Sequence, residues 1–202
     1  MKIFLAKMVA HRIKEVTGIE NIPKQGPAII VSNHVGEQDG PLLYSLILRH
    51  TGQMPYSIAK WKILSGKFCR RFLHTIPIYK DRSKTLAYSS ALLKKNKFIV
   101  IFPEGGVNLT EDITKIKTGA IRLAIMNRVP IIPVGLVRMN RTPKYEIHHT
   151  MDILCGTLKI SINSPIYLDS WYNADINRKT LMDINRLVMS QVARLANKRY
   201  IG

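Results

Sequence analysis

The chain has 202 residues, of which 46% are hydrophobic and 22% are charged, so it suits one domain with a full core and excludes a disordered chain. Its formal net charge of +18 predicts an anionic partner: nucleic acid, an anionic lipid surface, or an acidic cofactor or carrier. Every apolar run is shorter than the roughly 18 residues that span a bilayer, so we expect a soluble or peripheral cytoplasmic protein without a transmembrane helix.

Apolar residues recur with helical spacing over residues 2–17, and basic residues separate them. This pattern predicts an amphipathic helix that ends at Gly18. Such a helix suits two roles equally, because it can lie on anionic lipid or dock on the domain itself. Residues 19–25 predict a short strand and a turn.

A short apolar run at residues 27–31 ends just before His34. The run predicts a buried strand, residues 33–36 a loop, and residues 42–50 a buried helix for which Asp39 is a candidate N-cap. His34 therefore follows the end of a core strand, which is where α/β proteins place their chemistry.

His34 and Asp39 enclose four residues across this strand-loop-helix corner. The corner can fold the carboxylate back onto the imidazole, which gives a general base with an orienting carboxylate. No Gly-x-Ser-x-Gly sequence supplies a nucleophile, so such a base would activate a substrate hydroxyl or water directly. The alternative is that Asp39 only caps the helix and that His34 is a surface loop residue.

Strands and helices alternate along the rest of the chain. We expect strands at residues 56–60, 76–79, 98–102, 129–137 and 158–162, and helices at residues 84–95, 117–127 and 178–200, with Ser83 capping the first of these helices. This order predicts an α/β fold with a mixed, mostly parallel sheet flanked by helices. We expect a single domain over residues 1–202, with an amphipathic N-terminal helix at 1–17, a core at 20–170 and an amphipathic C-terminal helix at 178–200.

The strand predicted at residues 98–102 ends in Phe102-Pro103-Glu104-Gly105-Gly106. A second core strand is thus followed by a carboxylate and by flexible glycines. Together with Asn33-His34-x-x-x-x-Asp39, this segment resembles the glycerolipid acyltransferase family, which includes lysophosphatidic acid acyltransferases. Further segments also look like that family over roughly residues 20–170: Lys117-Thr118-Gly119-Ala120, Val129–Val134 and Ser164-Pro165-Ile166.

The resemblance implies a transfer of an acyl chain to a lysolipid hydroxyl in phospholipid biosynthesis. The donor would be a thioester of coenzyme A or acyl carrier protein, and the acceptor a lysolipid such as 1-acylglycerol-3-phosphate. His34 would deprotonate the hydroxyl, Asp39 would orient His34, and no metal or prosthetic group would be required. The resemblance also implies a substrate-binding set: Asn33, Lys80, Arg82, Phe102, Pro103, Glu104, Gly105 and Gly106.

Two departures from the family pattern concern the acceptor. Val107 stands where the family often carries an arginine that would contact an acceptor phosphate. Lys80 stands where the family commonly has arginine, with Arg82 two residues later, and lysine offers a point charge instead of a bidentate fork. A different lysolipid, a glycolipid or an aminolipid therefore remains an alternative acceptor.

Three other classes of protein compete with this interpretation. The positive charge suits a nucleic-acid-binding protein, but no helix-turn-helix, zinc-finger or aromatic RNA-binding signature supports nucleic acid as the partner. The intact His34 and Asp39 argue against a non-catalytic lipid-binding relative. A thioesterase would keep the chemistry and use water as the acceptor.

Overall fold

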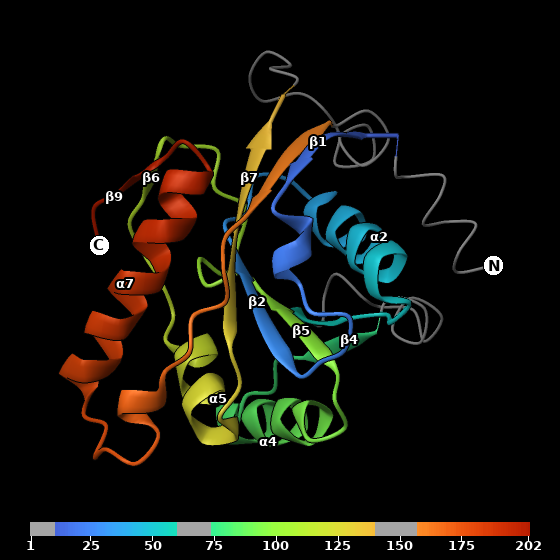
Figure 1. Ribbon diagram of the computed structural model, residues 1–202. Helices are drawn as coiled ribbons and strands as arrows, with labels where there is room; N and C mark the ends of the chain where they lie inside the picture. Colours follow the sequence, from blue (N-terminus) through green and yellow to red (C-terminus); the bar gives the residue numbers. More distant parts are fainter. Residues whose placement is uncertain (1–10, 60–73, 140–156) are drawn as a thin grey trace.

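A seven-stranded sheet forms the centre of the computed structural model, which describes residues 11–59, 74–139 and 157–202 (Figure 1). Its strands are β1 (Ile13–Thr17), β2 (Ala28–Ser32), β3 (Tyr56–Ala59), β4 (Thr75–Pro77), β5 (Phe98–Ile101), β7 (Ile131–Arg138) and β8 (Leu158–Ile162). They lie in the order β1-β8-β7-β2-β5-β3-β4, and the pair β7–β8 is antiparallel while the other pairs are parallel. The predicted mixed, mostly parallel sheet is therefore confirmed.

Helices cover both faces of the sheet (Figure 1). They are α2 (Asp39–Thr51), α4 (Arg82–Leu93), α5 (Gly119–Asn127) and α7 (Arg178–Leu195), with 3-10 turns η1 (Ile19–Asn21) and η3 (Asp169–Trp171). Alternate residues of β2 separate two cores, because Ile30 packs with the apolar residues of α2, whereas Ile29 packs with those of α4, α5 and α7. Within the described ranges, no helix combines the length and the apolar character that crossing a bilayer needs.

The neighbouring strands β2 and β5 place the two sequence motifs side by side. They pair in parallel, with Val31 opposite Ile101. The carboxyl ends of adjacent parallel strands meet at one edge of the sheet, so the segments after Ser32 and after Ile101 leave the sheet together. The fold thus brings residues that are 70 positions apart in the sequence into one site.

A second, two-stranded sheet joins the C-terminal segment to the segment that follows β5. It pairs β6 (Asp112–Ile113) with β9 (Arg199–Tyr200) in parallel. The backbone N–H of Arg199 also donates to the Glu111 carbonyl at 2.9 Å, and that of Ile201 to the Ile113 carbonyl at 3.1 Å.

The helix predicted over residues 2–17 is wrong at its C-terminal end, because residues 13–17 form β1; residues 2–10 lie outside the described part of the chain. The pairing of β1 with β8 shifts register between Ile13 and Glu15, which is the mark of a β-bulge. A bulge interrupts the alternation of faces, so Ile13 and Val16 both pack on the same core cluster although they are three residues apart. Three-residue spacing is also helical, and this ambiguity misled the prediction.

Three other predictions also need correction. Residues 19–21 form the 3-10 turn η1 where a strand was expected. Asp81, not Ser83, caps α4, since its carboxylate accepts the Ser83 N–H at 3.0 Å and the helix begins at Arg82. The C-terminal helix predicted to residue 200 ends at Leu195, because Asn197 adopts a left-handed backbone conformation (φ 54°) and residues 199–200 join β6.

Candidate active site

The imidazole of His34 and the carboxylate of Asp39 form a direct contact at the carboxyl end of β2. His34 Nδ1 lies 2.8 Å from Asp39 Oδ2. Since Asp39 is fully buried and the His34 side chain is 17% exposed, the pair presents the imidazole and not the carboxylate toward solvent. The sequence-based pairing of these two residues is therefore found in the structure.

Asp39 begins helix α2 and turns its carboxylate back onto the preceding loop. Its Oδ2 atom accepts the backbone N–H groups of Val35 at 2.6 Å and Gly36 at 3.0 Å as well as the contact from His34. Asp39 therefore shapes the loop that carries His34, although it is the first helical residue and not the N-cap that we expected. Burial raises the pKa of the Asp39 carboxyl, while the hydrogen bonds from His34, Gly36 and Val35 act to lower it.

The remaining ring nitrogen of His34 is free within the described part of the chain. An ionised Asp39 accepts the Nδ1 proton, which leaves the lone pair on Nε2. The imidazole also stacks on the ring of Phe102, with 4.4 Å between the ring centroids and 22° between the planes. Asp39 and Phe102 together limit the rotation of the ring, so Nε2 has a defined direction.

Glu104 contacts the backbone of His34 and not its ring. Its Oε1 accepts the His34 N–H at 2.9 Å, and its Oε2 accepts the side-chain amide of Asn108. The N–H of Asn108 donates in turn to the His34 carbonyl at 2.7 Å. Both polar groups of the His34 backbone are thus held by the segment after β5.

The turn that follows Glu104 leaves room on its outer side. Gly105 has a left-handed backbone (φ 75°), which favours glycine, and the Lys117 side chain fills the space where a Cβ atom would lie. A Cβ at Gly106 would meet nothing within 4 Å. Pro103 is buried behind this turn, and its carbonyl accepts the Lys117 N–H at 3.0 Å.

Asn33 has a different contact from the substrate contact that we expected. It is fully buried, and its side-chain amide pairs with the backbone of Leu136 in β7. The Asn33 amide donates to the Leu136 carbonyl at 2.9 Å, and its oxygen accepts the Leu136 N–H at 2.8 Å. Asn33 therefore ties the end of β2 to its neighbour, and both polar atoms of its buried side chain bond to backbone.

Lys80 and Arg82 make no hydrogen bond or ion pair with His34 or Asp39. Both are exposed, at the connection between β4 and α4. Neither makes a hydrogen bond or an ion pair with another residue in the described ranges. Val107 is 40% exposed on the turn after Glu104. Its uncharged side chain stands where the family often carries an arginine.

The sequence reasoning missed Asn108 and Lys198. Lys198 Nζ donates to the carbonyls of Asn108 at 2.8 Å and Thr110 at 2.6 Å. The signal for Asn108 was its place four residues after Glu104 in a loop, where asparagine commonly bonds to nearby backbone. No local signal marks Lys198, because its contacts span about 90 residues of sequence.

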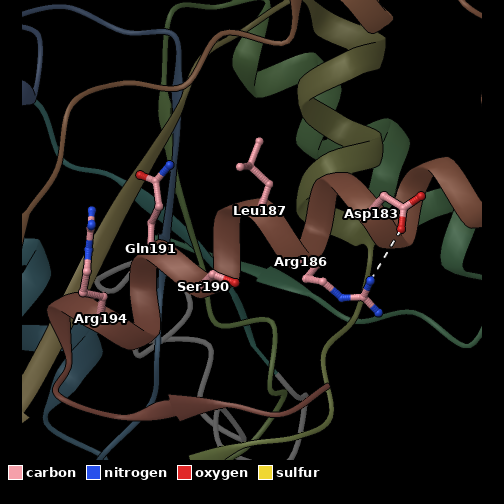
Figure 2. A pocket seen from close by; sticks show the side chains of 6 residues that line it. All are labelled: Asp183, Arg186, Leu187, Ser190, Gln191 and Arg194. Atoms are coloured by element: carbon pink, nitrogen blue, oxygen red, sulfur yellow. Dashed lines mark ion pairs between the residues drawn. The ribbon is translucent and has the colours of Figure 1, made fainter.

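A hollow of about 620 Å³ lies elsewhere, along the outer face of α7 (Figure 2). Its lining residues all belong to that helix: Asp183, Arg186, Leu187, Ser190, Gln191 and Arg194. Figure 2 shows the ion pair between Asp183 and Arg186, whose charged atoms lie 3.7 Å apart. None of the residues predicted for the site lines this groove, so it is not the candidate active site.

Comparison with known proteins identifies the family to which the chain belongs. The sequence profile of the family described as Acyltransferase matches residues 13–137, which include both motifs and the strands before them. The chain belongs to the acyltransferase family.

Several relatives carry a more specific name. The chain is 31% identical over 133 residues to a 1-acyl-sn-glycerol-3-phosphate acyltransferase of Borreliella burgdorferi, covering 62% of this chain and 51% of the relative. It is 29% identical over 124 residues to the enzyme of that name from Bacillus subtilis, covering 57% of this chain and 58% of the relative. The chain thus spans about half the length of these curated relatives.

A crystal structure shares the fold. It is that of the 1-acyl-sn-glycerophosphate (LPA) acyltransferase PlsC from Thermotoga maritima, with a TM-score of 0.69 over 96% of this chain and 78% of that chain. The sequence identity is 20%, so this likeness establishes the fold and no more.

Proposed function

We propose that the chain transfers an acyl group from a thioester to the free hydroxyl of a lysolipid, with 1-acylglycerol-3-phosphate as the acceptor. The observation that carries the proposal is the 2.8 Å contact between His34 and Asp39 at a strand end, with Nε2 of His34 free in the described part of the chain. The names of the relatives support the choice of acceptor.

In the proposed reaction, His34 Nε2 takes the proton of the acceptor hydroxyl as the oxygen attacks the thioester carbonyl. The ester C–O bond forms, and the C–S bond breaks as the tetrahedral intermediate collapses. The thiolate leaves and takes the proton back from the imidazolium. Asp39 holds the Nδ1 proton throughout and stabilises the charged imidazolium.

Glu104 has a supporting role in this proposal. It holds the backbone N–H of His34 at 2.9 Å and so keeps the imidazole at the strand end. The open side of the turn at Gly106 then borders the space in which the acceptor lies. Phe102 supports the ring of His34 from one face.

The acceptor phosphate needs a cation, and Lys80 and Arg82 are free of ion pairs with other described residues. Both follow the carboxyl end of β4, which is the end of the sheet that also carries His34. We assign them to the acceptor headgroup on this ground. The donor is acyl coenzyme A or acyl carrier protein, no metal or prosthetic group takes part, and the net charge of +18 holds the protein on the cytoplasmic face of an anionic membrane.

The test is an acyl-transfer assay with a panel of acceptors. The purified protein is given an acyl thioester alone, then with 1-acylglycerol-3-phosphate, a lysophosphatidylcholine or a lysoglycolipid, and the products are separated. The expected result is that 1-acylglycerol-3-phosphate is acylated, to diacylglycerol phosphate, and that the other two acceptors are not. Free fatty acid released equally with and without acceptors would make the protein a thioesterase instead.

A further inference from the structure

The C-terminal segment after α7 reaches back to the candidate active site, and the mechanism above leaves it without a role. Helix α7 packs tightly at its end, since a Cβ at Gly135 of β7 would lie 2.3 Å from the Leu195 carbonyl carbon. The chain then turns through Asn197 (φ 54°), and the N–H of Lys198 donates to the Ala193 carbonyl at 2.9 Å. The position of Lys198 is thus set by the packing of α7 on the central sheet.

Lys198 uses two of its three donors on the loop between β5 and β6. Its Nζ bonds the carbonyls of Asn108 and Thr110, at 2.8 and 2.6 Å, and the side chain is partly buried. Burial lowers the pKa of Lys198, while the charges of Glu104, Asp39 and Asp112 raise it. The half-buried ammonium therefore binds this loop near the carboxylates of Asp39, Glu104 and Asp112.

The loop that Lys198 holds is the one that holds His34. The N–H of Asn108 donates to the His34 carbonyl at 2.7 Å, and its side chain donates to Glu104 and to the Asp112 carbonyl. Glu104 accepts the His34 N–H at 2.9 Å. A continuous hydrogen-bonded path therefore runs from Lys198 through Asn108 to both polar groups of the His34 backbone.

We propose that Lys198 is a positioning residue for the reaction: it holds the Asn108 loop in the shape that keeps His34 and Glu104 aligned. This inference rests on the proposed function for its effect on rate, but not for its effect on the loop. Lys198 acts through Asn108 and touches neither substrate nor the imidazole. A loosened loop lets His34 Nε2 move relative to the acceptor hydroxyl, and small misplacements of a reacting group cost large factors in rate.

The variant Lys198→Met keeps most of the length of the side chain and removes its donors, whereas Lys198→Arg keeps a cationic donor at this position. Arg199→Met is the matched control, because it removes a cation one residue away whose exposed ion pair with Asp112 (2.7 Å) holds the same segment. We expect Lys198→Met to lower kcat about 10- to 100-fold, with little change in the KM for the acyl thioester or for the acceptor. Lys198→Arg should recover most of the loss, and Arg199→Met should stay within about twofold of the wild type.

Amide hydrogen exchange provides a readout that does not need activity. In Lys198→Met, the N–H groups of His34 and Asn108 should exchange faster, while the amides of β2 and β5 should keep their protection. Unchanged exchange at both loop amides, or a Lys198→Met enzyme with normal kcat, overturns the inference. Equal losses in Lys198→Met and Arg199→Met, with faster exchange across the sheet, would also overturn it. A wild-type protein that transfers no acyl group would refute the proposed function instead, and the exchange comparison would still decide the role of Lys198.

Discussion

A single oxygen of Asp39 carries much of the local structure of the site. Oδ2 accepts two backbone N–H groups and faces His34 Nδ1, so the same atom shapes the loop and orients the base. The other oxygen, Oδ1, is buried without a hydrogen-bond partner among the described residues. A buried carboxylate with one unpaired oxygen is costly to ionise, and a site retains such a group where its charge has a use.

The variant Asp39→Asn should separate activity from stability. We expect the rate of acyl transfer to fall by about 10²–10⁴, because the amide cannot stabilise the imidazolium or fix the useful tautomer. The measurement is kcat at neutral pH, with circular dichroism to establish that the variant is folded. A folded Asp39→Asn protein with wild-type kcat would show that Asp39 only shapes the loop.

The same variant has a predicted pH dependence of stability. Burial raises the pKa of Asp39 in the folded state above the value of about 3.9 in the unfolded chain, so the folded state binds this proton more tightly. As pH rises from about 4 through the folded pKa, the wild type should lose stability relative to Asp39→Asn, which does not titrate. Urea unfolding of both proteins across that range measures the difference. A wild type that gains on the variant as pH rises would mean that the three hydrogen bonds outweigh burial.

At the scale of elements, the core strands and the first motif were predictable because their signals are local. The apolar runs of β2 and β5 lie between breakers, and the His34–Asp39 spacing fits a strand-loop-helix corner. The bulge in β1 was not predictable, because it depends on pairing with β8, which lies more than 140 residues away. The roles of Glu104 and Lys198 depend likewise on which strands become neighbours, and the end of α7 depends on the pairing of β9 with β6.

The connection between β4 and α4 carries the prediction about the acceptor headgroup. If Lys80 and Arg82 bind the acceptor phosphate, Lys80→Ala or Arg82→Ala should raise the KM for 1-acylglycerol-3-phosphate about 10- to 100-fold, since a hydrogen bond to a charged group contributes about 1.5–3 kcal/mol. Lys84→Ala, which removes an exposed cation from the same helix, is the control. A preference for this acceptor that survives the loss of both Lys80 and Arg82 would assign phosphate recognition to other residues.

For the whole molecule, the charge of +18 predicts electrostatic attachment to anionic lipid. Each Lys or Arg near such a surface contributes about 1 kcal/mol, and salt screens the attraction beyond about 10 Å at 0.1 M. We expect co-sedimentation with vesicles that contain phosphatidylglycerol, and weaker binding as salt rises. Equal binding to neutral and anionic vesicles, unaffected by salt, would contradict the electrostatic part of the proposal.

The role of His34 as the base is the central claim, and one comparison tests it most directly. Wild type and His34→Ala are assayed for diacylglycerol phosphate formed from 1-acylglycerol-3-phosphate and an acyl thioester, with thermal unfolding of both proteins to show that the variant is folded. Removal of the general base should lower the rate about 10²- to 10⁴-fold while the fold persists. A folded His34→Ala protein that turns over at nearly the wild-type rate would contradict the mechanism.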